Sequence, residues 1–279
     1  LSLLTTLFIG FSIGANVNVA RTLGNQDDQG TKDGIHTAVS VSILSGSAMI
    51  LLGFLFGRPM LQWMGTPADV IDKASLYLMI IFIGMPSNMA YNFGSAILRA
   101  MGDSKRPMLF LMVTCILNVV LDLLFVAVLG YGVGAAALAT TIAQSLSAIL
   151  AFRRLTRPGT EYQVCWRQVR PDGPMLKQIL AIGLPSGVQN SIISLANVIV
   201  QSNINQFGPH AMAGCGVYFK IEGFGFLPIT CFAMALSTFV GQNLGARQYD
   251  RVKKGVRFGI LCSVVLAELM GVAIFFLGP

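Results

Sequence analysis

The sequence predicts an all-α, polytopic membrane protein, and three observations carry this prediction. Of the 279 residues, 54% are hydrophobic and only 11% are charged, whereas soluble domains carry roughly 25% charged residues. The mean hydropathy is +0.70. The apolar residues are gathered into runs long enough to cross a bilayer as helices, and the basic residues lie mainly between alternate runs.

Eight apolar stretches are expected to span the membrane. The first is short at its start, so we expect the sequence to belong to a longer protein. The seventh carries Gly223, Gly225 and Pro228, which favour a kink. The approximate limits of the eight stretches are 1–20, 36–57, 74–98, 108–130, 132–153, 178–207, 210–243 and 256–278.

The basic residues predict how these helices are oriented. Sixteen of the 19 lysines and arginines follow the first, third, fifth and seventh spans, and the alternate loops hold only Arg58 and Lys73. Cytoplasmic loops carry such an excess of basic residues, so both chain ends are expected on the outer side of the cytoplasmic (inner) membrane. The net charge of +7 therefore reflects topology, and we expect no nucleic-acid partner.

A faint internal repeat predicts two lobes. At an offset of 221 residues, five residues near the end of the first span match five near the end of the seventh. Six spans separate the copies, so both have the same orientation, as in parallel repeats related by an axis along the membrane normal. We expect twelve helices in all, with an N-terminal lobe at 1–153 that lacks its first helix, a cytoplasmic inter-lobe loop at 154–177, and three helices of a C-terminal lobe at 178–279. Similar small-residue helix ends without a repeat are the alternative.

One span carries a polar face. The apolar run 108–129 is interrupted by Thr114, Asn118 and Asp122, whose steps of four residues place them on one side of a helix. A carboxylate within a span costs about 3 kcal/mol or more unless it faces protein or water. We therefore expect this face to point inward and to be functional. Hydrogen bonding to neighbouring helices alone is the alternative.

Depth in the membrane predicts a partner for Asp122. Asp122 lies eight residues before Gly130, and Thr140 lies eight residues after Gly132. Because helices rise by a constant amount per residue, both side chains should lie at the same distance from this outer turn. The sequence therefore predicts that Asp122 and Thr140 meet.

Other polar residues within spans predict a substrate cavity or packing contacts between helices. The sixth span carries a stripe on one face, and the third carries a polar patch. Glu222, near the Gly/Pro break of the seventh span, is a second candidate for ion coupling, unless it only neutralises Lys220. His36 and His210 are expected to be ordinary loop residues. The cavity candidates are Asn88, Tyr91, Asn92, Asn190, Asn197 and Gln201.

Six stretches resemble the multidrug and toxic compound extrusion (MATE) family of efflux transporters, in the family's order and along the whole chain. The resemblance implies a V-shaped pair of six-helix lobes, of which this chain would hold the second to the ninth helix. It also implies export of organic cations or drugs, driven by an inward H⁺ or Na⁺ gradient. The stretches are VARTLGNQDD at 19–28, ILRAMGDSKRP at 97–107, LNVVLDLLF at 117–125, YGVGAAALATTIAQ at 131–144, GLPSGVQ at 183–189 and VGQNLGARQ at 240–248.

The resemblance also implies residue roles. In proton-coupled members, an aspartate on the first helix acts with an Asn and an Asp on the fifth and a Thr on the sixth. The latter three resemble Asn118, Asp122 and Thr140, and the first-helix aspartate would precede this sequence. In Na⁺-linked members, a glutamate follows the Leu-Pro of the seventh helix, whereas this chain reads NSIIS at 190–194. The departure favours H⁺ over Na⁺ as the coupling ion, with no other cofactor and no metal.

Two competing functions are weighed against export. A lipid-linked oligosaccharide flippase of the same superfamily should have a cationic cavity for pyrophosphate, but only Lys220 lies within a span. A membrane-embedded enzyme would need paired acids or a histidine motif such as HExxH, and the sequence has none. We therefore expect a monomeric exporter of small organic cations, surrounded by membrane lipid, and not an enzyme.

Overall fold

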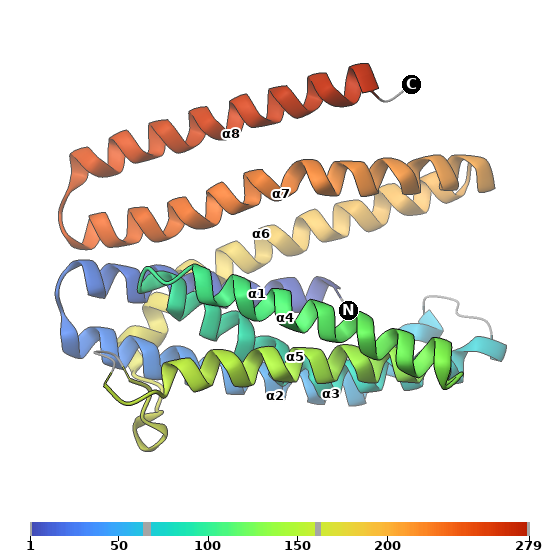
Figure 1. Ribbon diagram of the computed structural model, residues 1–279, viewed down its shortest axis with the longest axis horizontal. Coiled ribbons are helices and arrows are strands. Elements are labelled where there is room, and N and C mark those ends of the chain that lie inside the picture. The colour runs from blue at the N-terminus through green and yellow to red at the C-terminus, as the bar shows by residue number, and fades with distance from the viewer. Residues whose placement is uncertain (1, 64–67, 160–162, 278–279) are drawn as a thin grey trace.

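The computed structural model describes residues 2–63, 68–159 and 163–277. In these ranges the chain forms eight long α-helices that run up and down a single bundle (Figure 1). A π-helical segment, η1 (Leu123–Val128), continues α4, and a short 3₁₀ turn, η2 (Trp166–Gln168), lies between α5 and α6. The α-helices are α1 (Ser2–Gly24), α2 (Asp28–Trp63), α3 (Ala68–Ala100), α4 (Lys105–Asp122), α5 (Val133–Leu155), α6 (Gly173–Asn205), α7 (Pro209–Gly245) and α8 (Tyr249–Leu277).

Seven helices of the described chain, α2 to α8, are long and apolar enough to cross a bilayer. A chain within lipid must satisfy its own backbone hydrogen bonds, which favours helices. The expectation of a multi-pass, all-helical membrane protein is therefore confirmed. The first of the eight predicted spans, α1, is not among the seven. α1 contacts α2, α3, α6 and α7.

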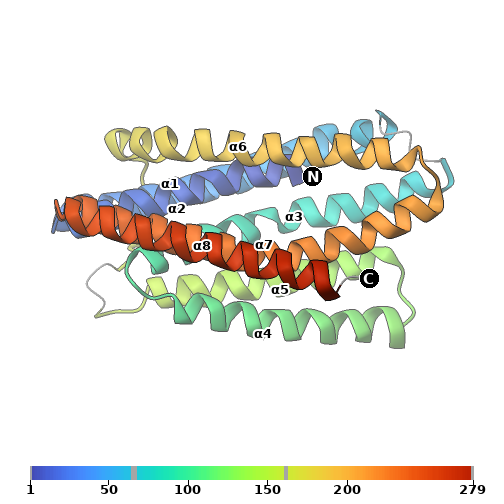
Figure 2. The same ribbon diagram turned by 90° about the horizontal axis from the view of Figure 1, so that it is seen from above.

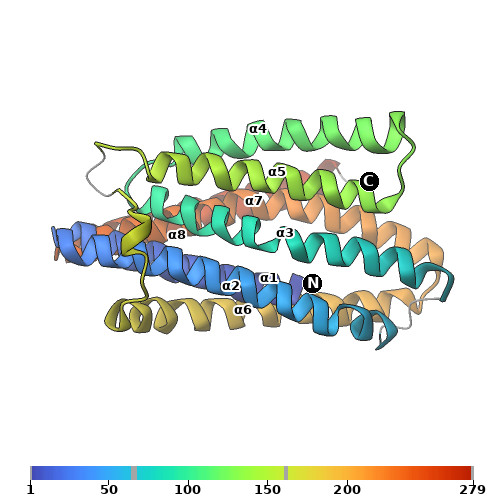
Figure 3. The ribbon, with the colours of Figure 1, turned by 90° about the horizontal axis from the view of Figure 1, so that it is seen from below.

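α4 presents its apolar side chains to the outside of the bundle. It packs mainly on α5, and Figures 2 and 3 show α4 and α6 at opposite edges of the bundle. So large an exposed apolar surface is rare on a soluble monomer, but it is what a lipid-facing helix requires. The α4 side chains that are more than half exposed are Met108, Leu109, Leu111, Met112, Val113, Ile116, Val119 and Val120.

The basic loops gather at one end of the bundle. The turns from α1 to α2, from α3 to α4 and from α7 to α8 lie there, together with the segment that joins α5 to α6 (Figure 1). The remaining connections lie at the opposite end. We call the first the basic end. Its assignment to the cytoplasm stays a prediction from the charge distribution.

α1 and α6 pack backbone against backbone. A Cβ atom added to Gly10 would overlap the backbone of Gly187, and one added to Gly14 would overlap the carbonyl of Ile179. Small residues permit this close approach, which gains dispersion contacts that apolar lipid cannot replace. The helix that opens the predicted C-terminal lobe is thereby fixed against the first helix of the chain.

The turns at the ends of α1 and α7, where the internal repeat lies, have the same structure. Gln26 and Arg247 are the two non-glycine residues with a positive φ in the described chain, and each has a φ of 55°. The hydrogen bonds of the two turns also correspond at the offset of 221 residues. The N–H groups of Asn25, Gln26 and Asp27 donate to Arg21, Leu23 and Thr22, and those of Ala246, Arg247 and Gln248 donate to Gln242, Leu244 and Asn243.

These two turns also touch each other reciprocally. A Cβ on Gly24 would overlap the Gln242 carbonyl, and a Cβ on Gly245 would overlap the Arg21 carbonyl. Gly24 corresponds to Gly245 and Arg21 corresponds to Gln242 at the offset of 221 residues, so each contact is the counterpart of the other. The related pair Ala20 and Gly241 meet directly, because a Cβ on Gly241 would lie 3.0 Å from that of Ala20. Reciprocal contacts of this kind are what a local two-fold axis produces.

Candidate functional site

A polar cavity of about 240 Å³ lies between α3, α4 and α5. Its polar side chains come from three helices that are otherwise apolar. A cavity of this polarity inside a membrane protein can hold water or hydrogen-bond a ligand. The lining residues are Asn88, Tyr91, Leu111, Thr114, Cys115, Asn118, Thr140, Ala143, Gln144 and Ser147. Five of the residues singled out from the sequence therefore come together: Asn88, Tyr91, Thr114, Asn118 and Thr140.

Asn118 and Thr140 join α4 to α5 across this cavity. The Asn118 amide donates to the Thr140 hydroxyl at 3.4 Å, and that hydroxyl donates to the Ala136 carbonyl at 3.0 Å. Thr114, one helical turn from Asn118, bonds the Phe110 carbonyl at 2.9 Å. The hydroxyl groups of both threonines thus donate to carbonyls of their own helices. The side-chain oxygen of Asn118 makes no hydrogen bond that is identified among the described residues.

α3 supplies the other wall. The Tyr91 hydroxyl, which is buried, donates to the Pro107 carbonyl at 2.9 Å and so ties α3 to the first turn of α4. Asn92 donates to both the backbone and the side-chain oxygen of Asn88, each at 2.9 Å. Asn92 therefore orients the Asn88 amide that lines the cavity, although Asn92 itself is not among the lining residues.

Asp122 lies one turn beyond the cavity, where α4 gives way to η1. Its Oδ1 atom is buried and has no hydrogen-bond partner among the described residues. The expected contact with Thr140 is not formed, because Asn118 occupies that place. The π-helix contributes to this shift: its i→i+5 hydrogen bonds wind more residues into each turn, so Asp122 lies nearer the outer turn than an α-helical rise predicts.

The α6 residues lie apart from this cavity. Asn197 is exposed, and Asn190 and Gln201 are partly exposed. Two serines lie on the same face of α6. The Ser186 hydroxyl donates to the Ile182 carbonyl at 2.9 Å, and the Ser194 hydroxyl donates to the Asn190 carbonyl at 3.0 Å. The described chain thus forms no joint site from the third-span and sixth-span polar residues.

Glu222 lies on α7 and is partly buried. Its expected pairing with Lys220 falls outside the described residues, because the Lys220 side chain is not described. The same holds for the side chain of His210. Glu222 stays a candidate from sequence alone.

Sequence reasoning missed two hydroxyl- or amide-bearing lining residues, Gln144 and Ser147. They follow Thr140 on α5 at steps of four and three residues, which places all three on one face. This is the same signal that singled out Asn118 and Asp122. On α5 this signal is masked by the many small residues, which are typical of a packing surface.

His36 was wrongly expected in a loop. α2 begins at Asp28, and Asp27 stabilises its start by accepting from the Gly30 N–H at 2.9 Å. His36 is buried within α2: its Nε2 accepts from the Cys165 N–H at 3.1 Å, and its Nδ1 lies 2.7 Å from the Lys32 carbonyl. The ring therefore holds the segment before α6 against α2, with its proton on Nδ1.

A second set of polar contacts closes the bundle near the basic end. Buried Asn16 on α1 donates to the Ala96 carbonyl at 2.9 Å and accepts from the Thr238 hydroxyl at 3.0 Å. Gln242 donates to the Ala100 carbonyl at 2.8 Å. These bonds connect α1, α3 and α7, and we call Asn16, Thr238 and Gln242 the seam residues.

Comparison with known proteins now identifies the family. A family model described as MatE matches residues 1–124 and 185–279. The chain belongs to the MatE family. The matched ranges contain Asn118 and Asp122 on α4 and the seam residues on α1 and α7.

Relatives and solved structures agree with this membership. The chain is 28% identical to "Probable multidrug resistance protein YoeA" of Bacillus subtilis (strain 168) over 98% of its own length and 60% of that protein. A "MATE in the bent conformation" superposes with a TM-score of 0.90 at 26% identity, over 99% of this chain and 62% of the other. An outward-facing multidrug resistance MATE transporter superposes with a TM-score of 0.92 at 24% identity, over 100% of this chain and 62% of the other. This MatE chain spans about three-fifths of the length of the relatives it matches.

Proposed function

We propose that the protein is a secondary-active multidrug efflux transporter of the cytoplasmic membrane, which exchanges an external cation for organic cations or drugs. Membership of a transporter family and relatives named as multidrug resistance proteins support this proposal. The observation that carries it is the partly open cavity between α3, α4 and α5, which is lined by polar side chains of otherwise apolar helices. A membrane protein that only scaffolds other proteins would not need this cavity, and no enzymatic motif accompanies it.

The proposed coupling ion is H⁺, and its carrier is Asp122. The buried Oδ1 of Asp122 has no partner among the described side chains. An unpaired carboxylate oxygen in a low-dielectric site is costly, and a proton removes the charge that makes it so. Na⁺ would call for further oxygen ligands, and the segment 190–194 offers no acid. Glu222 is the second candidate carrier.

The proposed architecture is a pair of six-helix lobes, of which this chain holds the second to the ninth helix. The matching turns after α1 and α7 and their reciprocal contacts support a two-fold relation. Packing beyond the turns agrees. A Cβ on Gly34 of α2 would approach the Asn18 side chain of α1, and one on Gly255 of α8 would overlap the Phe239 side chain of α7. Both pairs are related by the same 221-residue offset.

The proposed mechanism is alternating access, with the structure closed at its basic end. The seam residues and the backbone contacts of Gly24 and Gly245 hold α1, α3 and α7 together there. If that end is cytoplasmic, the substrate sites face outward in this state. Protonated and ionised Asp122 favour different surroundings, and a group that changes its interactions between two conformations shifts their populations.

A gradient experiment tests the proposal. The full-length protein is reconstituted in vesicles, and transport of a fluorescent organic cation is followed under a pH gradient, a Na⁺ gradient or neither. We expect transport under the pH gradient alone. Transport under Na⁺ alone would reassign the coupling ion. Movement of a pyrophosphate-linked lipid instead of the dye would favour the flippase, although none of the ten residues that line the cavity is basic.

A further inference from the structure

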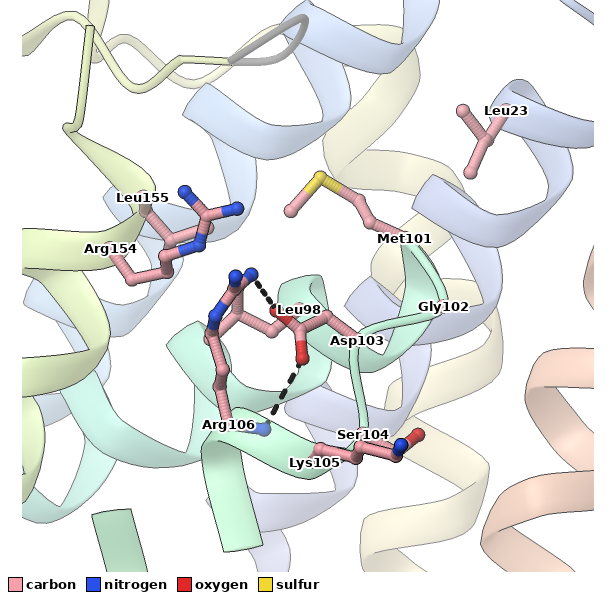
Figure 4. Close-up of a pocket in the computed structure, with 10 residues that line it drawn as sticks. All are labelled: Leu23, Leu98, Met101, Gly102, Asp103, Ser104, Lys105, Arg106, Arg154 and Leu155. Carbon is pink, nitrogen blue, oxygen red and sulfur yellow. Dashed lines mark hydrogen bonds and ion pairs between the residues drawn. The ribbon is translucent and has the colours of Figure 1, made fainter. Parts of the chain in front are cut away.

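A larger cavity, of about 800 Å³, opens at the basic end between the ends of α1, α3, α4 and α5 (Figure 4). It is separate from the polar cavity described above and shares none of its lining residues. One wall is apolar and the other is charged. The lining residues are Leu23, Leu98, Met101, Gly102, Asp103, Ser104, Lys105, Arg106, Arg154 and Leu155.

The charged wall carries more positive than negative charge. Its cations are Lys105, Arg106 and Arg154, and its one acid is Asp103. Asp103 is already engaged: it forms an ion pair with the Arg106 guanidinium and accepts from the Arg106 backbone N–H at 3.2 Å. Lys105 and Arg154 are left without a counter-charge inside the cavity.

Arg154 distinguishes this cavity from an ordinary basic loop. Its Nε atom is buried and has no hydrogen-bond partner among the residues described. Figure 4 shows its guanidinium pointing into the cavity, toward the region that the Arg106 guanidinium also approaches. The preceding residue, Arg153, is exposed to solvent. The positive-inside rule accounts for a solvated cation such as Arg153, but it gives no reason to bury an unpaired guanidinium nitrogen.

We propose that this cavity binds a phosphate-bearing anion, either the headgroup of an anionic phospholipid or a soluble phosphate. A guanidinium matches two phosphate oxygens at once, and Lys105 adds a point charge. Leu98, Met101 and Leu155 provide an apolar wall that suits the glycerol and acyl carbons beside a headgroup.

This site goes beyond the proposed transport function and does not depend on it. The anion would lie at the ends of three helices, one of which, α4, faces lipid along its length. It would offset the charges of Lys105 and Arg154 and bridge α5 to the start of α4. Binding is therefore expected to raise the thermal stability of the protein as well as to retain the anion.

The experiment uses the full-length protein and two probes. In the first arm, the protein is placed in phosphatidylcholine nanodiscs with and without phosphatidylglycerol, and retained lipid is counted by native mass spectrometry. In the second, inorganic phosphate is titrated against protein in phosphatidylcholine alone, at constant ionic strength set with chloride, and the melting temperature is followed. Arg154→Gln is compared with the matched control Arg153→Gln. We expect Arg154→Gln to weaken binding on the order of tenfold and Arg153→Gln to leave it unchanged.

The two arms separate the sources of the anion. Loss of phosphatidylglycerol alone in Arg154→Gln assigns a lipid headgroup, and loss of the phosphate response alone assigns a soluble phosphate. If both variants behave alike with both probes, diffuse surface charge explains any binding and the proposal is overturned. If Arg154→Gln does not elute as a monodisperse folded protein, Lys105→Gln, an exposed substitution, is subject to the same comparison and the same criterion.

Discussion

At the scale of single residues, three α4 side chains near the proposed site differ in their hydrogen bonding. Thr114 is satisfied by its own helix, Asn118 reaches across to Thr140, and Asp122 ends with a buried oxygen that has no described partner. Equal spacing in the sequence therefore leads to three different surroundings. The difference arises because α4 itself supplies the partner of Thr114, whereas a neighbouring helix supplies the partner of Asn118.

The Asn118–Thr140 bond gives a prediction for a single hydroxyl. Thr140→Val keeps the side-chain volume but removes the acceptor, so the Asn118 amide is left unpaired in the cavity. We expect a destabilisation of about 1 kcal/mol and a several-fold slower export of an organic cation. The measurements are thermal unfolding and dye transport in vesicles. Thr156→Val, which removes a hydroxyl outside the cavity, should change transport little. Equal effects of both variants would contradict the assignment.

At the scale of elements, helix positions were predictable and helix ends were not. Long apolar runs located α2 to α8 because lipid imposes hydropathy on exposed helices. The predicted stretch 1–20 likewise falls on α1, where protein supplies partners for Asn16 and Asn18. The criterion fails at the start of α2, where a polar extension stays helical and brings His36 into contact with Cys165.

The candidate site was predictable in membership but not in pairing. Periodicity places Asn118 and Asp122 on one face, depth and the family resemblance single out Thr140, and the structure brings Asn118 and Thr140 to one cavity. A constant α-helical rise places Asp122 at the depth of Thr140 and so predicts the wrong partner. The sequence LLFVAV at 123–128 contains no signal for the π-helix that changes this depth. The α6 stripe has the right periodicity too, but a stripe alone does not say which helix will face it.

The α1–α6 contact gives a prediction for an element pair. Gly14→Ala forces a methyl group into the Ile179 carbonyl, so the helices must separate. We expect a loss of about 1–3 kcal/mol, as for other overpacked sites, measured by thermal unfolding in detergent. Gly271→Ala on α8 meets no atom within 4 Å and should be neutral or stabilising, since alanine is the better helix former. A neutral Gly14→Ala would show that the two helices are not packed this closely.

At the scale of the whole molecule, the charge distribution and the packing combine into one account. The end that carries the basic loops is also the end closed by the seam residues. If the positive-inside rule holds, the closed end is cytoplasmic and the state is outward-facing. The two-fold contacts at the turns after α1 and α7 lie at this same end, where two lobes that rock against each other would have to part.

Orientation can be measured with a native cysteine. Cys165 is exposed and lies in the segment between α5 and α6. In a protein that retains only this cysteine, a membrane-impermeant maleimide should label inside-out vesicles and not intact cells. Labelling of intact cells would invert the topology and, with it, the assignment of the closed end.

The seam gives a prediction about conformational balance. Thr238→Val removes the hydroxyl that Asn16 accepts from, and this bond should be absent once the basic end opens. The variant is expected to populate the inward-facing state more, with faster labelling, from the cytoplasmic side, of a cysteine that replaces the buried, similarly sized Thr22. Thr230→Val, on the same helix as Thr238 but outside the seam, is the control. Unchanged labelling in Thr238→Val would remove the seam from the gating account.

The most direct test of the central claim is proton movement coupled to export in the Asp122→Asn variant. The substitution mimics the protonated carboxyl in shape but cannot release a proton. In vesicles that contain the full-length protein and a pH-sensitive dye, addition of an organic cation should drive proton flux in the wild type and none in Asp122→Asn. Folding is checked by thermal unfolding, and Glu222→Gln serves as the parallel variant. Wild-type proton flux in Asp122→Asn would contradict the account, and its loss in Glu222→Gln alone would move the coupling site to α7.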